Sequence, residues 1–179
     1  MLRRILVFGL IAGLVEGIPL FSMTLWLPNH SLTLVEEMAI GYTVMLISLS
    51  TVFIAIKRRR DEDLGGIIGF WQALLLGLAI SFIASLFYVA AWEAAVDIGH
   101  IDFAGGYARQ VIAEQKAKGI SAEALAKLIA EMNAFKAEYA NPFYRLSEAF
   151  SEMFPVGVLV SLISAGLLCN HRFLPVRRS

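Results

Sequence analysis

Glu16 is the residue of this chain whose chemistry is hardest to explain by packing alone. It lies inside an apolar run that begins at Ile5, near the midpoint of a helix that would cross a membrane or a little beyond it. Carboxylates inside a membrane are costly and usually face a bundle interior or water. With Gly13, Gly17 and Pro19 around it, Glu16 can line a pore, relay a proton or bind a cationic group. The alternative is a structural, protonated carboxyl, which the lack of a basic residue within any apolar run favours.

Either role predicts that Glu16 points into a bundle, beside the place where another helix comes close. Even a neutral carboxyl needs a hydrogen-bond partner when it is buried in hydrocarbon. The expected partners are hydroxyls at compatible depth on the later apolar runs: Ser48, Ser50, Ser81, Ser85, Ser161 and Ser164.

Glu93, Asp97 and His100 form a second group that could carry chemistry. Their spacing, i, i+4 and i+7, places them on one face of a helix. Two carboxylates and an imidazole can hold a divalent metal. The alternative is an ordinary polar helix end, which is favoured because a metal site also needs ligands from a second helix.

Other sequence signatures of catalysis are absent. Phosphate-loop, dinucleotide-binding, zinc-finger and Cys-x-x-Cys patterns do not occur. No His or Lys stands at a depth that would activate the serines of the apolar runs. Cys169 is the single cysteine, so an intramolecular disulfide is excluded. We predict no catalytic residue and no cofactor, and the balance of 15 basic and 15 acidic residues argues against a nucleic-acid partner.

The elements that must position these residues are apolar helices. Of the 179 residues, 58% are hydrophobic and 17% charged, and the mean hydropathy is +0.70, whereas soluble domains have about 25% charged residues. A hydrocarbon core about 30 Å thick needs about 20 apolar residues in a helix. Four stretches qualify, at about 5–27, 38–56, 67–96 and 150–170, with Pro155 expected in the first turn of the last one. They predict an all-α, four-helix transmembrane bundle.

Basic residues predict the orientation of the spans. Nine of them lie before the first span, between the second and third, and after the fourth, against three acidic residues. Residues 97–152 have six basic and eight acidic residues. By the positive-inside rule, both termini and the 57–66 loop are cytoplasmic. A cleaved signal peptide is the rival for the first span, but Glu16, the length of the run and the lack of an Ala-x-Ala site argue against it.

Residues 97–149 are predicted to form an extramembrane helical hairpin. Asp102 and Ser121 are the expected N-caps of its helices, and Gly119 is the expected C-cap between them. Asn141-Pro142 is expected to break the second helix. A third, amphipathic piece over 143–154 is expected to lie at the membrane interface before the last span.

Small residues recur every four positions along three of the spans. Helices in lipid associate through close backbone approach at such residues. We expect the seams to pack the bundle itself, and the alternative is that one of them faces a second copy or another membrane protein. The seam residues are Gly9, Gly13, Gly17, Gly69, Ala73, Gly77, Gly157 and Ser161.

Five strings of the sequence form a recognisable set. They are RRILVFGLIAGLVEGIPLF, EMAIGYTVMLISLSTVFIAIKRRRD, GGIIGFWQALLLGLAISFIASLFYVAAWE, FKAEYANPFYR and FPVGVLVSLISAGLLCN. Over nearly its whole length the chain resembles the bacterial membrane-protein family catalogued as domain of unknown function 4199. The resemblance implies a small four-span protein of the bacterial inner membrane, with 97–149 in the periplasm. The resemblance implies no particular activity, and hence it assigns no catalytic residue.

The sequence leaves two main hypotheses for function. The first is a non-enzymatic membrane protein that acts by packing with itself, with membrane lipids or with a membrane-protein partner. The second is a small transporter or lipid-handling protein that uses Glu16 in a polar cavity. A transporter needs a polar path through the bundle, whereas a scaffold is packed shut. An intramembrane or metal-dependent enzyme comes third.

Overall fold

The protein is all-helical over the residues that the structure, a computed structural model, describes: 2–26 and 33–175. The helices are α1 (Leu2–Trp26), α2 (Leu34–Arg58), the π-helix η1 (Arg59–Asp63), α3 (Phe70–Gly99), α4 (Phe103–Ala117), α5 (Ala122–Tyr139) and α6 (Pro142–Leu168). Four helical segments, within α1, from α2 through η1, in α3 and in α6, are long and apolar enough to cross a membrane. The predicted fold class, a helical membrane bundle, is confirmed.

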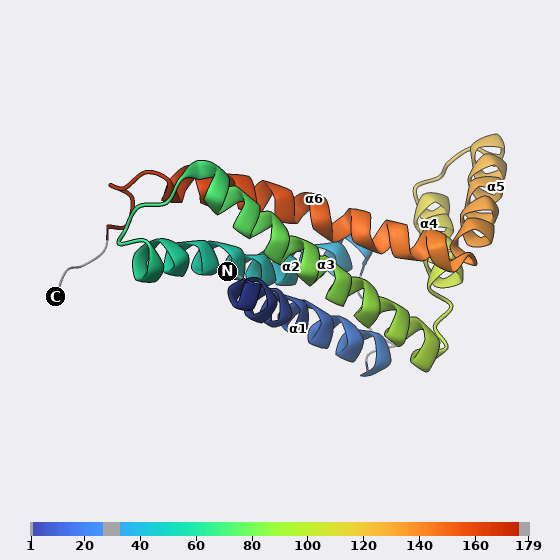
Figure 1. The fold of residues 1–179 in the computed structure, drawn as a ribbon. Helices are drawn as coiled ribbons and strands as arrows, with labels where there is room; N and C mark the ends of the chain where they lie inside the picture. Colours follow the sequence, from blue (N-terminus) through green and yellow to red (C-terminus); the bar gives the residue numbers. More distant parts are fainter. Residues whose placement is uncertain (1, 27–32, 176–179) are drawn as a thin grey trace.

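The four long helices lie side by side, and the α4–α5 hairpin stands at one end of them (Figure 1). We call this the hairpin end, and the opposite end, which holds η1 and the last turn of α6, the terminal end. α1 and α6 each pack against α3 and, less extensively, against α2. A larger share of α3 is buried than of the other spans, so α3 is the central helix of the bundle.

The glycines of α1 form its contact with α3. The facing pairs are Gly9–Ile83, Gly13–Phe87 and Gly17–Ala91. Residue numbers rise together along both helices, so α1 and α3 run parallel. A Cβ atom on Gly13 would collide with the Phe87 side chain. This is the close backbone approach that the four-residue spacing predicts.

In the contact between α3 and α6, each helix places a glycine against a serine of the other helix. A Cβ atom on Gly77 would lie 2.8 Å from Ser161 Oγ, and one on Gly157 would lie 2.6 Å from Ser81 Cβ. The Ser81 hydroxyl donates a hydrogen bond to the Gly157 carbonyl oxygen at 3.2 Å. Ala73, another seam residue of α3, is completely buried. The small residues of α1, α3 and α6 are therefore occupied by contacts within the chain.

Gly69 does not take part in this packing, and its assignment to the seam was wrong. It is the N-cap of α3, in extended conformation, and a Cβ atom added there would meet nothing within 4 Å. The predicted third span placed Gly69 inside a helix, whereas α3 begins one residue later, at Phe70. The spacing of small residues alone does not reveal where the helix starts.

The predicted break before the last span is also absent. Residues 143–154 do not form a separate interfacial piece, because α6 continues from Pro142 to Leu168 as one helix. Pro155 lies inside that helix rather than in its first turn. Its missing N–H removes one intrahelical hydrogen bond. The helix therefore carries polar residues before Pro155 directly into the bundle.

The helix caps of the hairpin lie at the residues that the sequence predicts. The Asp102 side chain accepts from Gly105 N, and the Ser121 side chain accepts from Ala124 N, so both predicted N-caps are confirmed. Gly119 has a φ of 74° after α4, and Asn141 caps α6. The bond from Gly105 holds the pKa of Asp102 below its usual range.

A capping box opens α2. The Glu36 backbone N–H donates to Thr33 Oγ1, and the Thr33 backbone N–H donates to Glu36 Oε2 at 2.8 Å. The second of these hydrogen bonds lowers the pKa of Glu36. Two of the otherwise unpaired donors at this helix start are thus satisfied.

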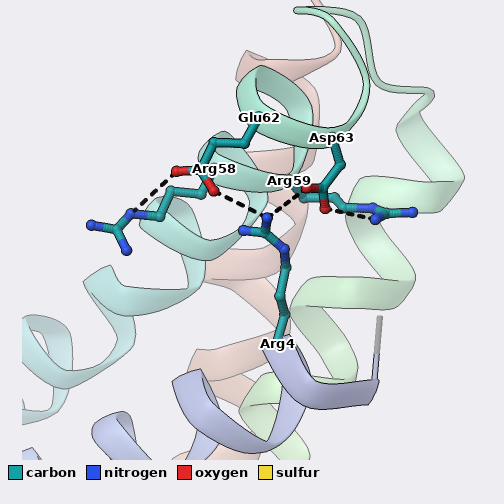
Figure 2. Close-up of polar contacts among 5 residues, drawn as sticks. All are labelled: Arg4, Arg58, Arg59, Glu62 and Asp63. Atoms are coloured by element: carbon teal, nitrogen blue, oxygen red, sulfur yellow. Dashed lines mark hydrogen bonds and ion pairs between the residues drawn. The ribbon is translucent and has the colours of Figure 1, made fainter.

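Ion pairs hold the terminal end together (Figure 2). Arg4 of α1 reaches Glu62 at 3.0 Å and Asp63 at 2.7 Å, and Arg59 also bonds Asp63 at 2.7 Å. Figure 2 shows the Arg4 guanidinium below the two carboxylates, with Arg58 and Arg59 on either side. The turn between α2 and α3 is therefore tied to the first turn of α1.

Arg60 has a different role from the arginines around it. Its side chain is completely buried. It donates to the carbonyl oxygens of Phe173 at 2.8 Å and Leu174 at 2.6 Å, and to Asp61 Oδ1 at 2.6 Å. The sequence suggested only a basic cluster at a membrane surface, whereas Arg60 binds the segment that follows α6.

Candidate functional site

Glu16 points into the bundle, the orientation expected from the sequence, and is only 4% exposed. Ser48 of α2 donates to the Ala12 carbonyl oxygen at 2.7 Å. Because α1 and α2 are antiparallel, the buried Met45 lies about level with Glu16, one turn beyond Ser48. The contact of Gly17 with Ala91 places Glu16 toward the hairpin end of α3.

Five of the six hydroxyls predicted to bond Glu16 donate to other groups. Ser48 donates to the Ala12 carbonyl oxygen of α1, and Ser81 donates to the Gly157 carbonyl oxygen of α6. Ser50, Ser85 and Ser161 donate to carbonyl oxygens of their own helices. Serine in a membrane helix can bond its own backbone three or four residues back, and this local option outcompetes a distant carboxyl. Glu16 Oε2 is buried without a hydrogen-bond partner among the described residues.

The polar groups that act electrostatically on Glu16 belong to α3 and α6. Tyr88 of α3 is buried, and its hydroxyl donates to Glu152 Oε2 of α6 at 2.8 Å. Glu152 and Tyr88 both lie within electrostatic reach of Glu16. We call Glu16, Tyr88 and Glu152 the acidic cluster. Glu152 itself is exposed, so the cluster is not sealed on every side.

Sequence reasoning missed two of these three residues. It placed Glu152 where the amphipathic piece 143–154 and the last span, about 150–170, overlap, and gave it no role. Tyr88 was one of several aromatic residues in an apolar run. The apolar residues Phe150 and Met153 extended the predicted span across Glu152, but nothing in the sequence indicated that Tyr88 would lie opposite it.

Glu93 is not a metal ligand here, because a cation already occupies its carboxylate. Arg145 Nε and Nη2 donate to the two Glu93 oxygens at 3.0 and 2.8 Å. Among the described residues, no group of three or more His, Cys, Asp and Glu side chains could hold a metal ion. Asp97 is exposed, and His100 ends α3 with a φ of 47°. The minor alternative of a metal site at Glu93, Asp97 and His100 is wrong.

The same region docks the hairpin on the bundle. Trp92 Nε1 donates to the Tyr139 hydroxyl at 2.8 Å, and Arg145 also reaches the Tyr139 carbonyl oxygen at 3.4 Å. Burial raises the pKa of Tyr139 to about 12. The ring of Phe103 lies edge-on to Trp92, 4.9 Å between centroids. The hydrogen bonds from Trp92 and Arg145 to Tyr139, together with the ring contact of Phe103 with Trp92, thus hold the hairpin on the bundle.

The acidic cluster can bind a positively charged group. Two carboxyl groups within electrostatic reach of each other repel when both are ionised, and a proton or a bound cation removes the repulsion. Arg145, the basic side chain nearest along α6, is committed to Glu93. The arrangement therefore lacks the built-in counter-ion that a purely structural acidic residue usually has.

The fold and the acidic cluster define a class: a helical membrane bundle with a buried carboxyl, that of Glu16, toward one end and an exposed one, that of Glu152, within electrostatic reach of it. The family model described as "Protein of unknown function (DUF4199)" matches residues 7–170. The chain belongs to this family, as the resemblance of its strings indicated. No curated protein and no solved structure matches the chain.

Proposed function

We propose that the protein is a non-enzymatic membrane protein that binds a small cationic group between Glu16 and Glu152. The buried Glu16 Oε2 atom, which has no hydrogen-bond partner among the described residues, carries this proposal. Leaving a carboxylate oxygen buried and unpaired costs about 1–3 kcal/mol or more. A ligand that donates to that oxygen recovers this cost, so the site is arranged for a partner that the described part of the chain does not supply.

This proposal places the second of the two hypotheses from the sequence ahead of the first. A role in assembly through the small-residue seams needs a seam that faces outward. Gly13, Gly77 and Gly157 instead meet side chains of their own bundle at close range. The motif that suggested an assembly role is thus used for folding, and the acidic cluster is the feature that folding leaves unexplained.

The test of this function is binding of ethylammonium by the protein in lipid nanodiscs, measured by titration calorimetry. We expect saturable binding to the wild type. Glu16→Gln keeps the size of the side chain and removes its charge, so it should weaken binding at least about tenfold. The midpoint of thermal unfolding should stay within about 3 °C, because no hydrogen bond is lost.

Glu148→Gln is the matched control, since Glu148 lies one turn from Glu152 on α6 and is exposed. We expect this variant to bind as the wild type does. Equal affinity of the wild type and Glu16→Gln, or no binding to either, would overturn the proposed function.

We further propose that the protein lies in a bacterial inner membrane, with the terminal end in the cytoplasm and residues 97–149 in the periplasm. The basic residues of the terminal end support this orientation, since three of the spans meet it with Lys or Arg. Reporter fusions check it: a periplasm-active reporter inserted after Gly119 should be active, and one at Gly65 should be silent. The reverse pattern would contradict the orientation.

A further inference from the structure

We infer that an anionic phospholipid binds at the terminal end where α1 meets α2, with its phosphate on Arg58 and one acyl chain along the exposed apolar residues of the two helices. We call Phe8, Ile11, Ile47 and Arg58 the α1–α2 surface. It lies toward the opposite end of the bundle from the acidic cluster, so it is a second site beyond the proposed function.

The terminal end has more positive charge than its own carboxylates neutralise. Each of the three carboxylates there is already shared by two cations. The excess charge is therefore complementary to the phosphates of an anionic membrane surface. Among the described residues, the charged side chains of this end are Arg3, Arg4, Lys57, Arg58, Arg59, Arg60 and Arg172 against Asp61, Glu62 and Asp63.

Arg58 presents its guanidinium to such a phosphate. It is the last residue of α2, its side chain is 61% exposed, and its ion pair with Glu62 is 4.0 Å long. The guanidinium carbon lies over the ring of Phe8 of α1, 5.9 Å from the ring centroid. Figure 2 shows the guanidinium directed away from Arg4 and Arg59. A ring against one face leaves the N–H groups in the guanidinium plane, and these match two phosphate oxygens.

Apolar residues continue from this arginine toward the middle of the bundle. On α1, Ile11 follows Phe8 by three residues and is 42% exposed. On α2, Ile47 lies three turns before Arg58 on the same helix face and is 58% exposed. A hydrogen bond from α2 to the Ala12 carbonyl oxygen keeps the two helices in contact at this level. The charged and apolar parts of the surface are thus continuous.

This order of charge and apolar surface matches a phospholipid in a bilayer. Arg58 lies near the end of its span, whereas Ile11 and Ile47 lie nearer the bundle centre. The phosphate is therefore at the membrane surface, and the acyl chain is inside the membrane. A free phosphate would contact the arginine without the apolar residues. The ammonium of a zwitterionic lipid would meet the excess positive charge of this end, so charge complementarity favours a headgroup with a net negative charge.

The first arm of the test measures which lipid stays with the protein. Protein purified from nanodiscs of equal parts phosphatidylglycerol and phosphatidylcholine should retain the former preferentially in native mass spectrometry. Arg58→Gln should lower this enrichment about fivefold, the effect of one basic residue at a membrane surface. This variant should unfold near the wild-type temperature, because the ion pair that it loses is long and exposed.

Arg3→Gln is the matched control for Arg58→Gln. Arg3 is also an exposed arginine of the terminal end, but it lies five residues before Phe8, on another face of α1. We expect this variant to keep the wild-type enrichment. Equal enrichment in the wild type and Arg58→Gln would overturn the inference. An equal loss in both variants would also overturn it, because the charge of the whole end would then select the lipid.

The second arm tests the acyl chain. Ile47→Trp places a large side chain on the path of the chain and should reduce the retained phosphatidylglycerol. Leu46→Trp, at a 55% exposed position on another face of α2, should leave it unchanged. A millimolar excess of inorganic phosphate should not displace the lipid. Displacement by phosphate, or equal retention in the two tryptophan variants, would overturn the phospholipid as the ligand. Amine binding at Glu16 is measured separately, so the proposed function stands or fails independently of these results.

Discussion

Gly157→Leu is expected to unfold the bundle in mild detergent. Gly157 of α6 faces Ser81 of α3, where even a Cβ atom would lie 2.6 Å from the Ser81 Cβ and 2.8 Å from its Oγ. A leucine must push the two helices apart, which breaks the hydrogen bond from Ser81 to the Gly157 carbonyl oxygen. Overpacking in a core costs about 1–3 kcal/mol, and we expect more here because α3 is the central helix and cannot move without disturbing α1.

Gly166→Leu is the control for this experiment. Gly166 lies in the same helix, is exposed, and a Cβ atom there would meet nothing within 4 Å. Thermal unfolding followed by size-exclusion chromatography should show a loss of folded protein for Gly157→Leu and a midpoint near wild type for Gly166→Leu. Equal stability of the two variants would mean that the seam does not hold α3 and α6 together.

The small-residue spacing predicted the helix packing well because lipid removes most alternatives. Where hydrophobic burial does not discriminate between faces, a glycine every four residues marks the face that approaches another backbone. Gly13 and Gly157 both follow this rule. Gly69 shares the spacing and fails, because the rule applies only inside a helix and the start of α3 could not be read from apolar residues alone.

The candidate site could be predicted only in part. Glu16 stood out because a carboxyl in an apolar run is rare. Its surroundings depend on which residues of α3 and α6 lie level with it. That alignment comes from the packing of the helices against one another, and the sequence of one span does not encode it. The pairing of Tyr88 with Glu152 requires α6 to continue through Pro155, and local propensity argues for a helix that starts there.

The same limit applies to the 57–60 run of basic residues, where one arginine is buried and the others are not. Arg58 has a side chain that is 61% exposed, whereas Arg60 is completely buried. Arg60 continues the stripe of the buried Val52 and Ile56 at intervals of four residues, whereas Arg58, two residues before it, lies on the opposite face of the helix. Gly66 N donates to the Arg60 carbonyl oxygen at 2.8 Å and closes the turn. The sequence did not reveal this burial because an arginine is almost never fully buried unless it is paired, and its partners in the segment after α6 are distant in sequence.

Arg60→Leu is therefore expected to be among the most destabilising substitutions at the terminal end. It would leave the carbonyl oxygens of Phe173 and Leu174 and the carboxylate of Asp61 without the donors that now lie 2.6 to 2.8 Å away. Removing one partner of a buried charge pair costs about 3–5 kcal/mol. Arg60→Lys should recover little of the stability that Arg60→Leu loses, because one ammonium group cannot reproduce the planar guanidinium that bonds three acceptors.

Arg58→Leu is the matched control, since Arg58 pairs with Glu62 only at 4.0 Å and from an exposed position. Exposed pairs contribute about 0–1 kcal/mol, so this variant should unfold near the wild-type temperature. Limited proteolysis provides a second readout: in Arg60→Leu, the segment after α6 should be cut many times faster than in the wild type, while the α4–α5 hairpin is cut at an unchanged rate. Equal cutting in the Arg60 and Arg58 variants would show that the buried guanidinium does not hold this segment in place.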